Sequence, residues 1–238
     1  MTQGIFITGT DTGVGKSIAS AAIVMLLKQM GRSVGVMKPV TSGSLEREGG
    51  LVSLDAELLC FAAGIPLVPE CTPYLLKAPL APSVAASLEG VHIDFEVIRA
   101  AYLQLAERFE FVVVEGAGGL MVPLAGGLLM SDLALHLGLP IAVVARPDLG
   151  TVNHTLLTAY SARNLGLEVK GVIINRYPSL PDQAQESAPH LIASLSGSPL
   201  LGLFPEVPGC DDKEVVVEVV ARLNQDPATA IMLREMFK

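Results

Sequence analysis

The chain has 238 residues, of which 50% are hydrophobic and 17% charged, and its formal net charge is −8. This hydrophobic content is too high for a disordered chain and the length suits one large domain, which we expect to span residues 1–238. A net negative charge argues against a basic surface that binds nucleic acid.

Strand and helix patterns alternate from the N-terminus onwards. Apolar runs predict strands at residues 5–7 and 33–37, and the segment between them, 16–30, predicts a helix. A second helix is expected at 55–63. Residues 46–50, which are polar and contain glycines, are expected to form a mobile loop, and the proline-rich residues 66–82 are expected to form a surface loop or cover.

The second half of the chain continues the alternation. A helix is predicted at 94–109, where apolar side chains recur three or four residues apart and Asp94 precedes them as the N-cap. Three short runs of β-branched residues predict buried strands at 111–114, 141–144 and 172–174. Strands that alternate with helices indicate an α/β fold, with a parallel sheet covered by helices on both faces.

Ligands of such sheets bind at the carboxyl ends of the strands. The polar and glycine-rich segments of this chain follow the predicted strands, which places candidate functional residues at that edge. These segments are residues 9–17, 38–44, 115–119, 146–153 and 175–177.

The segment after the first strand is typical of a phosphate-binding loop. It reads Gly-Thr-Asp-Thr-Gly-Val-Gly-Lys-Ser over residues 9–17. Glycines let several backbone N–H groups converge on one anion, and the following helix adds the positive end of its dipole. The Lys16 ammonium can reach the β- and γ-phosphates, and the Ser17 hydroxyl can bind Mg²⁺. Five residues rather than the usual four separate Gly9 from Gly15, and a simple helix-capping turn is the alternative interpretation.

Two acidic residues and a second lysine are expected near this loop. Glu115 closes the predicted strand 111–114 and Asp55 begins a helix, so both are candidate Mg²⁺ ligands. Lys38 ends the second strand and is expected to face the same crevice as Lys16. The alternatives are an ordinary acidic strand end for Glu115, a helix N-terminal charge for Asp55 and a solvated lysine for Lys38.

Other common site types find little support. The cysteines, Cys60, Cys71 and Cys210, form no Cys-x-x-Cys pair, which argues against a disulfide framework or a structural zinc site. The four histidines show no ligand spacing. The N-terminus lacks the pattern of a secretory signal, and the longest apolar run is well short of the roughly 20 residues that a membrane helix needs. We expect a cytoplasmic protein without a membrane partner.

Three segments together resemble the dethiobiotin synthetases, ATP-dependent enzymes of biotin synthesis. They are residues 9–17, the Lys-Pro-Val-Thr-Ser-Gly of 38–43 and the Val-Glu-Gly-Ala-Gly-Gly of 114–119. The resemblance extends from residue 3 to about residue 208, and the wide glycine spacing of the loop is a feature of that family. It also includes residues 73–82, 149–154, 174–176 and 202–205.

The resemblance implies a P-loop NTPase-like three-layer sandwich and a ligase reaction. In that reaction one amine of 7,8-diaminopelargonate takes up CO2 as a carbamate, which attacks the γ-phosphate of ATP. The resulting carbamic-phosphoric anhydride is closed by the second amine to the cyclic urea of dethiobiotin, with release of ADP and phosphate. The family also implies a homodimer with two composite sites.

By the same resemblance, individual residues of this chain acquire expected roles. The catalytic residues are Thr12, Lys16 and Lys38. Those that bind ATP are Gly13, Val14, Gly15, Lys16, Ser17, Ile18, Asp55, Glu115, Gly116, Ala117, Gly118, Asn175, Arg176, Pro205, Glu206 and Val207. Those that bind Mg²⁺ are Ser17, Asp55 and Glu115. Those that bind the diamine substrate are Thr12, Lys38, Ser42 and Gly118, with Gly150, Thr151, Val152 and Asn153 contributed by the neighbouring subunit. Ser187 stands near the place where some members carry a carboxylate-binding tyrosine.

Two other classes of protein are alternatives. Partition and septum-site ATPases share the expected fold, but they carry an additional lysine early in the loop, where this chain has Thr10 and Asp11. They also often end in a basic membrane-binding helix, whereas the tail, 228–238, has only Arg234 and Lys238 as cations. Amidotransferase-linked synthetases of cobalamin synthesis need a glutaminase domain, for which this chain is too short.

Overall fold

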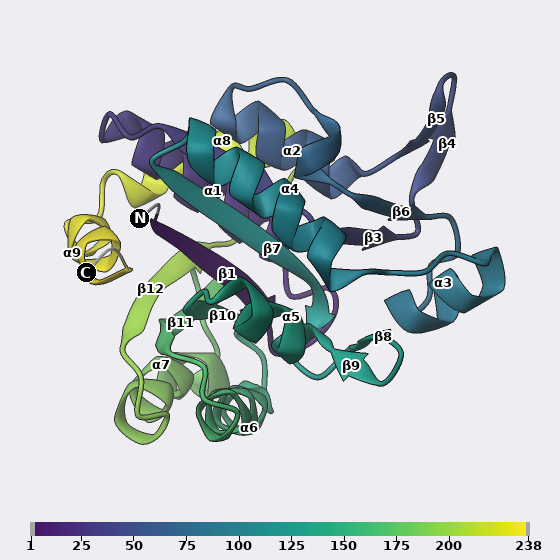
Figure 1. The fold of residues 1–238 in the computed structure, drawn as a ribbon. Helices are drawn as coiled ribbons and strands as arrows, with labels where there is room; N and C mark the ends of the chain where they lie inside the picture. Colours follow the sequence, from purple (N-terminus) through teal and green to yellow (C-terminus); the bar gives the residue numbers. More distant parts are fainter. Residues whose placement is uncertain (1–2, 237–238) are drawn as a thin grey trace.

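A six-stranded parallel sheet forms the centre of the computed structural model, which describes residues 3–236 (Figure 1). All neighbouring strands run parallel, so the predicted α/β class is confirmed. In their order across the sheet, the strands are β12 (Leu200–Pro205), β11 (Val169–Tyr177), β10 (Ile141–Ala145), β1 (Gln3–Gly9), β7 (Phe111–Gly119) and β2 (Val34–Met37).

Helices cover both faces of this sheet, because each right-handed crossover between parallel strands places a helix on one face. On one side lie α1 (Lys16–Gln29) and α8 (Asp212–Leu223), which pack against each other, with α2 (Leu54–Ala63) against α1. On the other side lie α4 (Phe95–Arg108), α5 (Met130–Leu137), α6 (Thr151–Asn164) and α7 (Gln183–Leu195). The last helix, α9 (Ala228–Met236), packs against β12.

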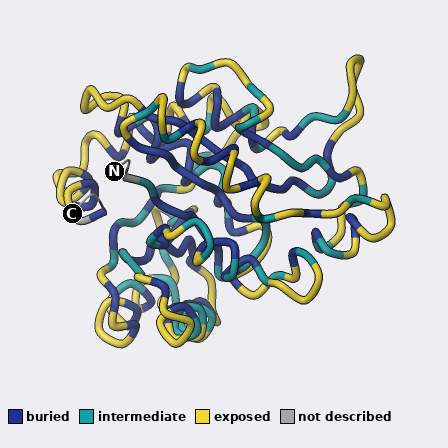
Figure 2. Tube along the Cα trace, in the orientation of Figure 1, coloured by how far each residue is buried: buried dark blue, intermediate teal, exposed yellow. Residues whose placement is uncertain are grey.

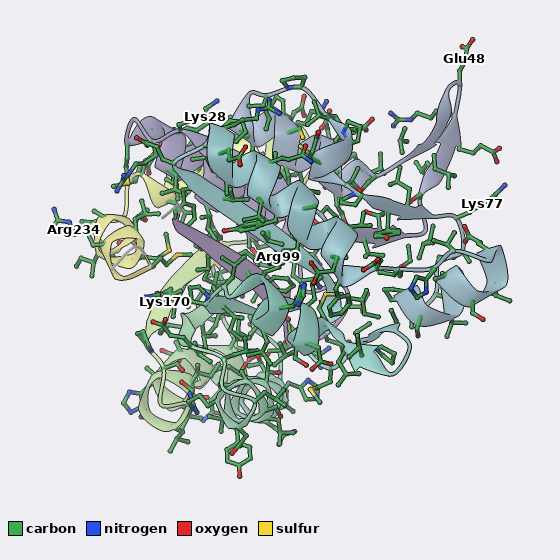
Figure 3. All side chains as sticks on the ribbon, viewed as in Figure 1. Lys28, Glu48, Lys77, Arg99, Lys170 and Arg234 are labelled. Atoms are coloured by element: carbon green, nitrogen blue, oxygen red, sulfur yellow. The ribbon has the colours of Figure 1, made fainter. Side chains whose placement is uncertain are left out.

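Several small elements extend the carboxyl end of the sheet. They are the parallel pair β3 (Val40–Ser42) and β6 (Tyr74–Leu76), the hairpin of β4 (Leu45–Arg47) and β5 (Gly50–Val52), the hairpin of β8 (Pro123–Ala125) and β9 (Leu128–Leu129), the 3₁₀ turn η1 (Pro69–Cys71) and helix α3 (Pro82–Glu89). Figure 3 shows Glu48 at the tip of the β4–β5 hairpin, pointing away from the body of the molecule.

Both predicted loops therefore contain regular structure, and that part of the prediction is wrong. Residues 46–50 belong to a hairpin, because the apolar residues that flank them pair in antiparallel register. The proline-rich segment 66–82 includes η1, β6 and the first residue of α3, and β6 is held by β3. Pairing between distant segments, which local composition does not report, is the cause in the second case.

Most residues of the five strands β1, β2, β7, β10 and β11 are buried, whereas the edge strand β12 is only partly buried (Figure 2). Every residue of β10 is buried, as expected for a continuous apolar run of a parallel sheet. Polar side chains inside this apolar layer are costly unless they have partners. Thr8, Glu115 and Asn175 are such residues, and the last two lie toward the carboxyl ends of their strands.

The predicted helix boundaries agree with the structure within one residue, whereas the predicted strands 5–7, 111–114 and 172–174 are shorter than the observed ones. Asp94 caps α4 by accepting a hydrogen bond from the Glu96 N–H at 2.8 Å, as predicted. Glu115 does not close its strand, however, because β7 continues to Gly119 with a bulge in its pairing with β1. Within residues 3–236 no helix is both long and apolar enough to cross a bilayer; Lys238 lies outside the described residues.

Candidate functional site: a phosphate loop and two lysines at one edge of the sheet

The loop between β1 and α1 has the backbone of an anion-binding site. Gly13 and Gly15 adopt the left-handed conformation, with φ of 77° and 83°, which other residues rarely tolerate. Gly15 is also the N-cap of α1. The backbone N–H groups of Gly13, Val14 and Gly15 donate to no acceptor within residues 3–236. Unpaired N–H groups at a helix N-terminus are suited to bind phosphate.

Two residues at the end of β11 donate hydrogen bonds to the backbone of this loop. The Asn175 side-chain amide donates to the carbonyl oxygens of Val14 at 3.0 Å and Gly15 at 3.1 Å. The Arg176 guanidinium donates to the carbonyl of Gly13 at 3.2 Å. The Oδ1 atom of Asn175 is buried and has no hydrogen-bond partner in the described part of the chain. This oxygen is therefore free to accept a hydrogen bond from a ligand.

Beside the loop, Lys38 holds two carboxylates together. Its Nζ lies 2.6 Å from Oε1 of Glu115 and 2.8 Å from Oδ2 of Asp55, and it also donates to the carbonyl of Gly116 at 3.3 Å. The Ser17 hydroxyl donates to the same two carboxylates, at 2.8 Å to Asp55 and 2.9 Å to Glu115. These contacts join α1, α2, β7 and the segment after β2, and they give the site its charge pattern.

The environment shifts the pKa of the two lysines in opposite directions. Burial, with repulsion by Lys38 as a second cause, lowers the pKa of Lys16 to about 8, because the acidic neighbours offset these two effects only in part. Burial also disfavours the charged form of Lys38, but the attraction of Glu115 and Asp55 outweighs it and raises the pKa of Lys38 above its ordinary value. Burial alone would raise the pKa of Asp55, but its ion pair with Lys38 lowers it. Lys38 therefore stays charged throughout the physiological range.

These residues surround one cavity of about 310 Å³. Lys16 and Lys38 both line it, so the predicted common crevice is confirmed. The other predicted site residues that line it are Thr12, Gly13, Gly15, Ser17, Ile18, Ser42, Asp55, Glu115, Ala117, Gly118 and Arg176. The structure thus brings together all the residues predicted to be catalytic and all those predicted to bind the metal.

The remaining predicted residues lie elsewhere. Val14 and Glu206 line a neighbouring cavity of about 340 Å³, which shares Thr12, Gly13 and Arg176 with the first. Gly150, Thr151, Val152 and Asn153 line a different cavity of about 440 Å³ beside α6 and α7. Gly116, Asn175, Pro205 and Val207 line none of these three cavities. None of the residues 150–153 lines the first cavity.

The structure also adds residues that were not among the predicted site residues. Val40, Thr41 and Asp212 line the first cavity, and Arg146 and Gln185 line the second. Asp212 is the first residue of α8, and the sequence signal for it was the preceding Asp211, which caps this helix by accepting from the Lys213 N–H at 2.8 Å. Only the packing of α8 against α1 places that helix start next to the phosphate loop.

The donor atoms around Ser17 fit a magnesium ion. Carboxylate and hydroxyl oxygens are the protein ligands that Mg²⁺ takes, usually alongside phosphate oxygens and water. Oε2 of Glu115 is buried without a hydrogen-bond partner among residues 3–236, so it has a free acceptor. No cluster of three or more His, Cys, Asp or Glu side chains in that part of the chain could hold a metal by itself. A site of two carboxylates and a serine thus requires the nucleotide to complete it.

Comparisons with known proteins agree with this geometry. A family model described as an AAA domain matches residues 3–214. The ATP-dependent dethiobiotin synthetase BioD of Bacillus subtilis subsp. natto is 41% identical over 92% of this chain and 93% of its own length. The enzyme of the same name from Thermodesulfovibrio yellowstonii is 40% identical over 86% and 89%.

Solved structures support the fold. The chain is similar to the MinD cell division protein of Aquifex aeolicus, with a TM-score of 0.57 and 15% identity over 99% of this chain and 95% of the other. A ParA family ATPase of Chlorobium tepidum has a TM-score of 0.57 and 14% identity over 98% and 97%. The septum site-determining protein MinD of Pyrococcus horikoshii, solved with Mg-ADP, has a TM-score of 0.54 and 19% identity over 99% and 94%.

Identities below 20% show a shared fold and no more, whereas about 41% over nine-tenths of both chains shows the family. The expected three-layer P-loop NTPase-like fold is thus confirmed, and so is the resemblance drawn from residues 9–17, 38–43 and 114–119. This chain belongs to the ATP-dependent dethiobiotin synthetases.

Proposed function

We propose that the dethiobiotin synthetase reaction of this chain takes place in the cavity of about 310 Å³ between the phosphate loop and Lys38. The observation that carries the proposal is that Lys16, at the start of α1, and Lys38, which follows β2, line the same cavity together with two carboxylates. A carbamate and a γ-phosphate are both anionic, so preorganised positive charge is what their approach requires.

The nucleotide would occupy the phosphate loop with its triphosphate at the N-terminus of α1. The free N–H groups of Gly13, Val14 and Gly15 and the Lys16 ammonium then bind its anionic oxygens. Ser17, Asp55 and Glu115 would hold Mg²⁺, which neutralises negative charge on the β- and γ-phosphates. Oδ1 of Asn175 has the free acceptor that the adenine amino group needs, and the backbone of 205–207 would lie on the same side.

The diamine would lie on the Lys38 side of the cavity. One of its amines combines with CO2 and loses a proton, which gives a carbamate next to Thr12 and Lys38. A carbamate oxygen attacks the γ-phosphorus and ADP leaves, so that a mixed anhydride forms. The second amine attacks the carbamate carbon, the bond from this carbon to the phosphate oxygen breaks, and the cyclic urea and phosphate are released with a proton.

The charge pattern suits this order of events. Lys38 is almost fully buried and keeps its proton, so it can stabilise the carbamate and the transferring phosphoryl group without acting as a base. Ser42 and Gly118 border the same space and would contact the substrate. Asp212 and Ile18 border the nucleotide side. The protein thus acts through positioning and electrostatics, which dominate the catalysis of phosphoryl transfer.

The substrate carboxylate would be bound by a second subunit. Gly150, Thr151, Val152 and Asn153, at the N-terminus of α6, line their own cavity away from Lys38. Within a homodimer this helix start would reach the neighbouring active site, where its dipole favours a carboxylate. The partners of the chain would then be the diamine, CO2, ATP and a second copy of itself.

The test is whether ATP turnover requires both diaminopelargonate and bicarbonate. For this chain we expect ADP release only when both are present, and one dethiobiotin formed for each ADP. A nucleotide switch of the partition or septum-site type, which shares the fold, would hydrolyse ATP without either substrate. That result would overturn the proposal.

Lys16→Ala tests the phosphate loop directly. Removal of one preorganised charge is expected to lower turnover by about 10²–10³-fold. The thermal unfolding midpoint should not fall, because burial already disfavours the Lys16 charge in the folded protein. Lys28→Ala is the control, since it removes an exposed lysine from the last turn of the same helix. Near-normal turnover of Lys16→Ala would contradict the assignment of residues 9–17 as the phosphate-binding loop.

A further inference from the structure

Arg176, at the end of β11, has an unusual backbone conformation. Its φ is 57°, and no other non-glycine residue in the described ranges has a positive φ. The left-handed region is unfavourable for a residue with a Cβ atom, and Arg is not among the types enriched there. Such a conformation persists only when the surroundings hold it, and it often marks a functional constraint.

The side chain of Arg176 reaches the phosphate loop. Its Nη1 donates to the Gly13 carbonyl at 3.2 Å, and the neighbouring Asn175 amide donates to the carbonyls of Val14 and Gly15. Three successive carbonyls of the loop are therefore bound by two successive side chains of β11. The left-handed turn at Arg176 lets adjacent residues of a strand, which normally point to opposite faces, reach the same loop.

The orientation of these carbonyls fixes the orientation of the phosphate-binding groups. In a trans peptide the C=O and the next N–H point in opposite directions. When the carbonyls of Gly13, Val14 and Gly15 face Asn175 and Arg176, the N–H groups of Val14, Gly15 and Lys16 face away from β11. The N–H groups of Val14 and Gly15 are free of partners among residues 3–236.

The hydrogen bond from Arg176 acts on Gly13, a residue with open space where a side chain would lie. A Cβ added to Gly13 would meet no atom within 4 Å, so no atom crowds the space beside this residue. Gly15, in contrast, is already packed against Asn175. Without Arg176 the Gly13–Val14 peptide can therefore rotate, since glycine has the widest choice of backbone angles.

We propose that Arg176 is a positioning residue for the phosphate loop: its guanidinium holds the Gly13 carbonyl outwards, so that the Val14 N–H is preset toward the phosphates of the nucleotide. The inference deepens the proposed function and rests on its assignment of residues 9–17. It predicts that Arg176 affects the binding of polyphosphates and leaves the binding of the nucleoside unchanged. A direct contact with the base, or a purely solvated arginine, predicts otherwise.

Three variants distinguish the effect of the left-handed backbone at Arg176 from the effect of its guanidinium. Arg176→Gly removes the guanidinium and relieves the left-handed strain, so its unfolding midpoint should equal or exceed that of the wild type. Arg176→Ala removes the guanidinium but keeps the strain, so its midpoint should be lower than that of Arg176→Gly. Arg176→Lys keeps a donor that can reach the same carbonyl.

Calorimetric titration with Mg-ADP and with AMP reads the effect on binding. For Arg176→Gly and Arg176→Ala we expect Mg-ADP affinity to fall by about tenfold, the value of one charge-assisted hydrogen bond. AMP affinity should be unchanged in both, and Arg176→Lys should lose less than either. Equal losses for AMP and Mg-ADP would assign Arg176 to the base or ribose instead. Wild-type Mg-ADP affinity in Arg176→Gly would also overturn the proposal.

Steady-state kinetics give an independent readout. The KM for ATP should rise in Arg176→Gly while the KM for diaminopelargonate stays unchanged, since the substrate side of the cavity is not touched. If Lys16→Ala retains turnover, the proposed function fails first. If Lys16→Ala is inactive and Arg176→Gly behaves as the wild type, only this inference fails.

Discussion

Glu115 is the residue on which the charge balance of the site depends. It is fully buried and lies 2.6 Å from the Lys38 ammonium, while its second oxygen has no partner within residues 3–236. A buried carboxylate is costly unless it is paired, and pairing with Lys38 meets that cost. The free oxygen then remains available for a metal. One side chain thus stabilises Lys38 and presents a ligand to the nucleotide side of the cavity.

Glu115→Gln removes the negative charge of this side chain and keeps its shape, so it tests both roles of the charge. We expect the Mg²⁺ concentration for half-maximal turnover to rise by at least about tenfold, because a neutral amide is a poor Mg²⁺ ligand. The free energy of unfolding should fall by about 2–4 kcal/mol, since the buried Lys38 keeps only Asp55 as a counter-charge. Metal titration and urea unfolding measure the two effects.

Glu46→Gln is the matched control for that change. It removes one carboxylate from the exposed ion pair with Lys77, whose atoms lie 2.7 Å apart. Exposed pairs contribute little, so neither the metal titration nor the unfolding midpoint should change measurably. An unchanged metal titration in Glu115→Gln would return Glu115 to the role of an ordinary acidic residue in a strand.

In the phosphate loop, Gly13 and Gly15 are glycines for different physical reasons. Both have positive φ, but a Cβ on Gly15 would overlap the Asn175 amide, whereas a Cβ on Gly13 would meet nothing within 4 Å. Gly13→Ala is therefore expected to lower the free energy of unfolding by about 1–2 kcal/mol through backbone strain. Gly15→Ala should lose a further ~1–3 kcal/mol through the clash. Urea unfolding compares the two, and equal losses would show that Asn175 moves aside freely.

The same elements show what the sequence could predict. Five of the six strands of the central sheet were predictable because their apolar runs are buried, and the turns at their ends carry glycines and charges that local patterns report. The edge strand β12 was not predicted, because it is only partly buried. The sequence predicted that Lys38, Glu115 and Asp55 lie near one another, but not that they form ion pairs. The distance between Lys38 and Glu115 depends on the register of β2 and β7, which the sequence does not report.

Other features depend on tertiary contacts and could not be predicted. The left-handed backbone of Arg176 follows from its reach to Gly13, which is 163 residues away in the chain. Asp212 reaches the cavity because α8 packs on α1. The pairing of β3 with β6 joins segments more than 30 residues apart, and a short apolar triplet such as β6 gives no signal of its partner.

At the scale of the whole molecule, one helix face is open beside the active site. Leu157 and Tyr160 of α6 are 56% and 65% exposed, and Leu149 just before the helix is 84% exposed. Leu157 also lines a cavity of about 340 Å³ together with Thr10, Asp11 and Thr12 of the phosphate loop. Exposed apolar side chains that adjoin the catalytic loop are suited to contact a second subunit. The same helix begins with 150–153, the proposed carboxylate-binding segment.

Leu157→Asp should therefore disrupt the proposed homodimer and weaken the binding of diaminopelargonate but not that of the nucleotide. A buried, unpaired charge at an interface is unfavourable, so sedimentation should shift from dimer to monomer at micromolar concentration. The KM for diaminopelargonate should rise by about tenfold or more, since one charge-assisted contact to its carboxylate is lost. Mg-ADP affinity should not change, because the nucleotide residues come from one chain. Val217→Asp, on the exposed side of α8, is the control and should remain dimeric. A wild-type protein that is monomeric and fully active at the same concentration would contradict the composite site.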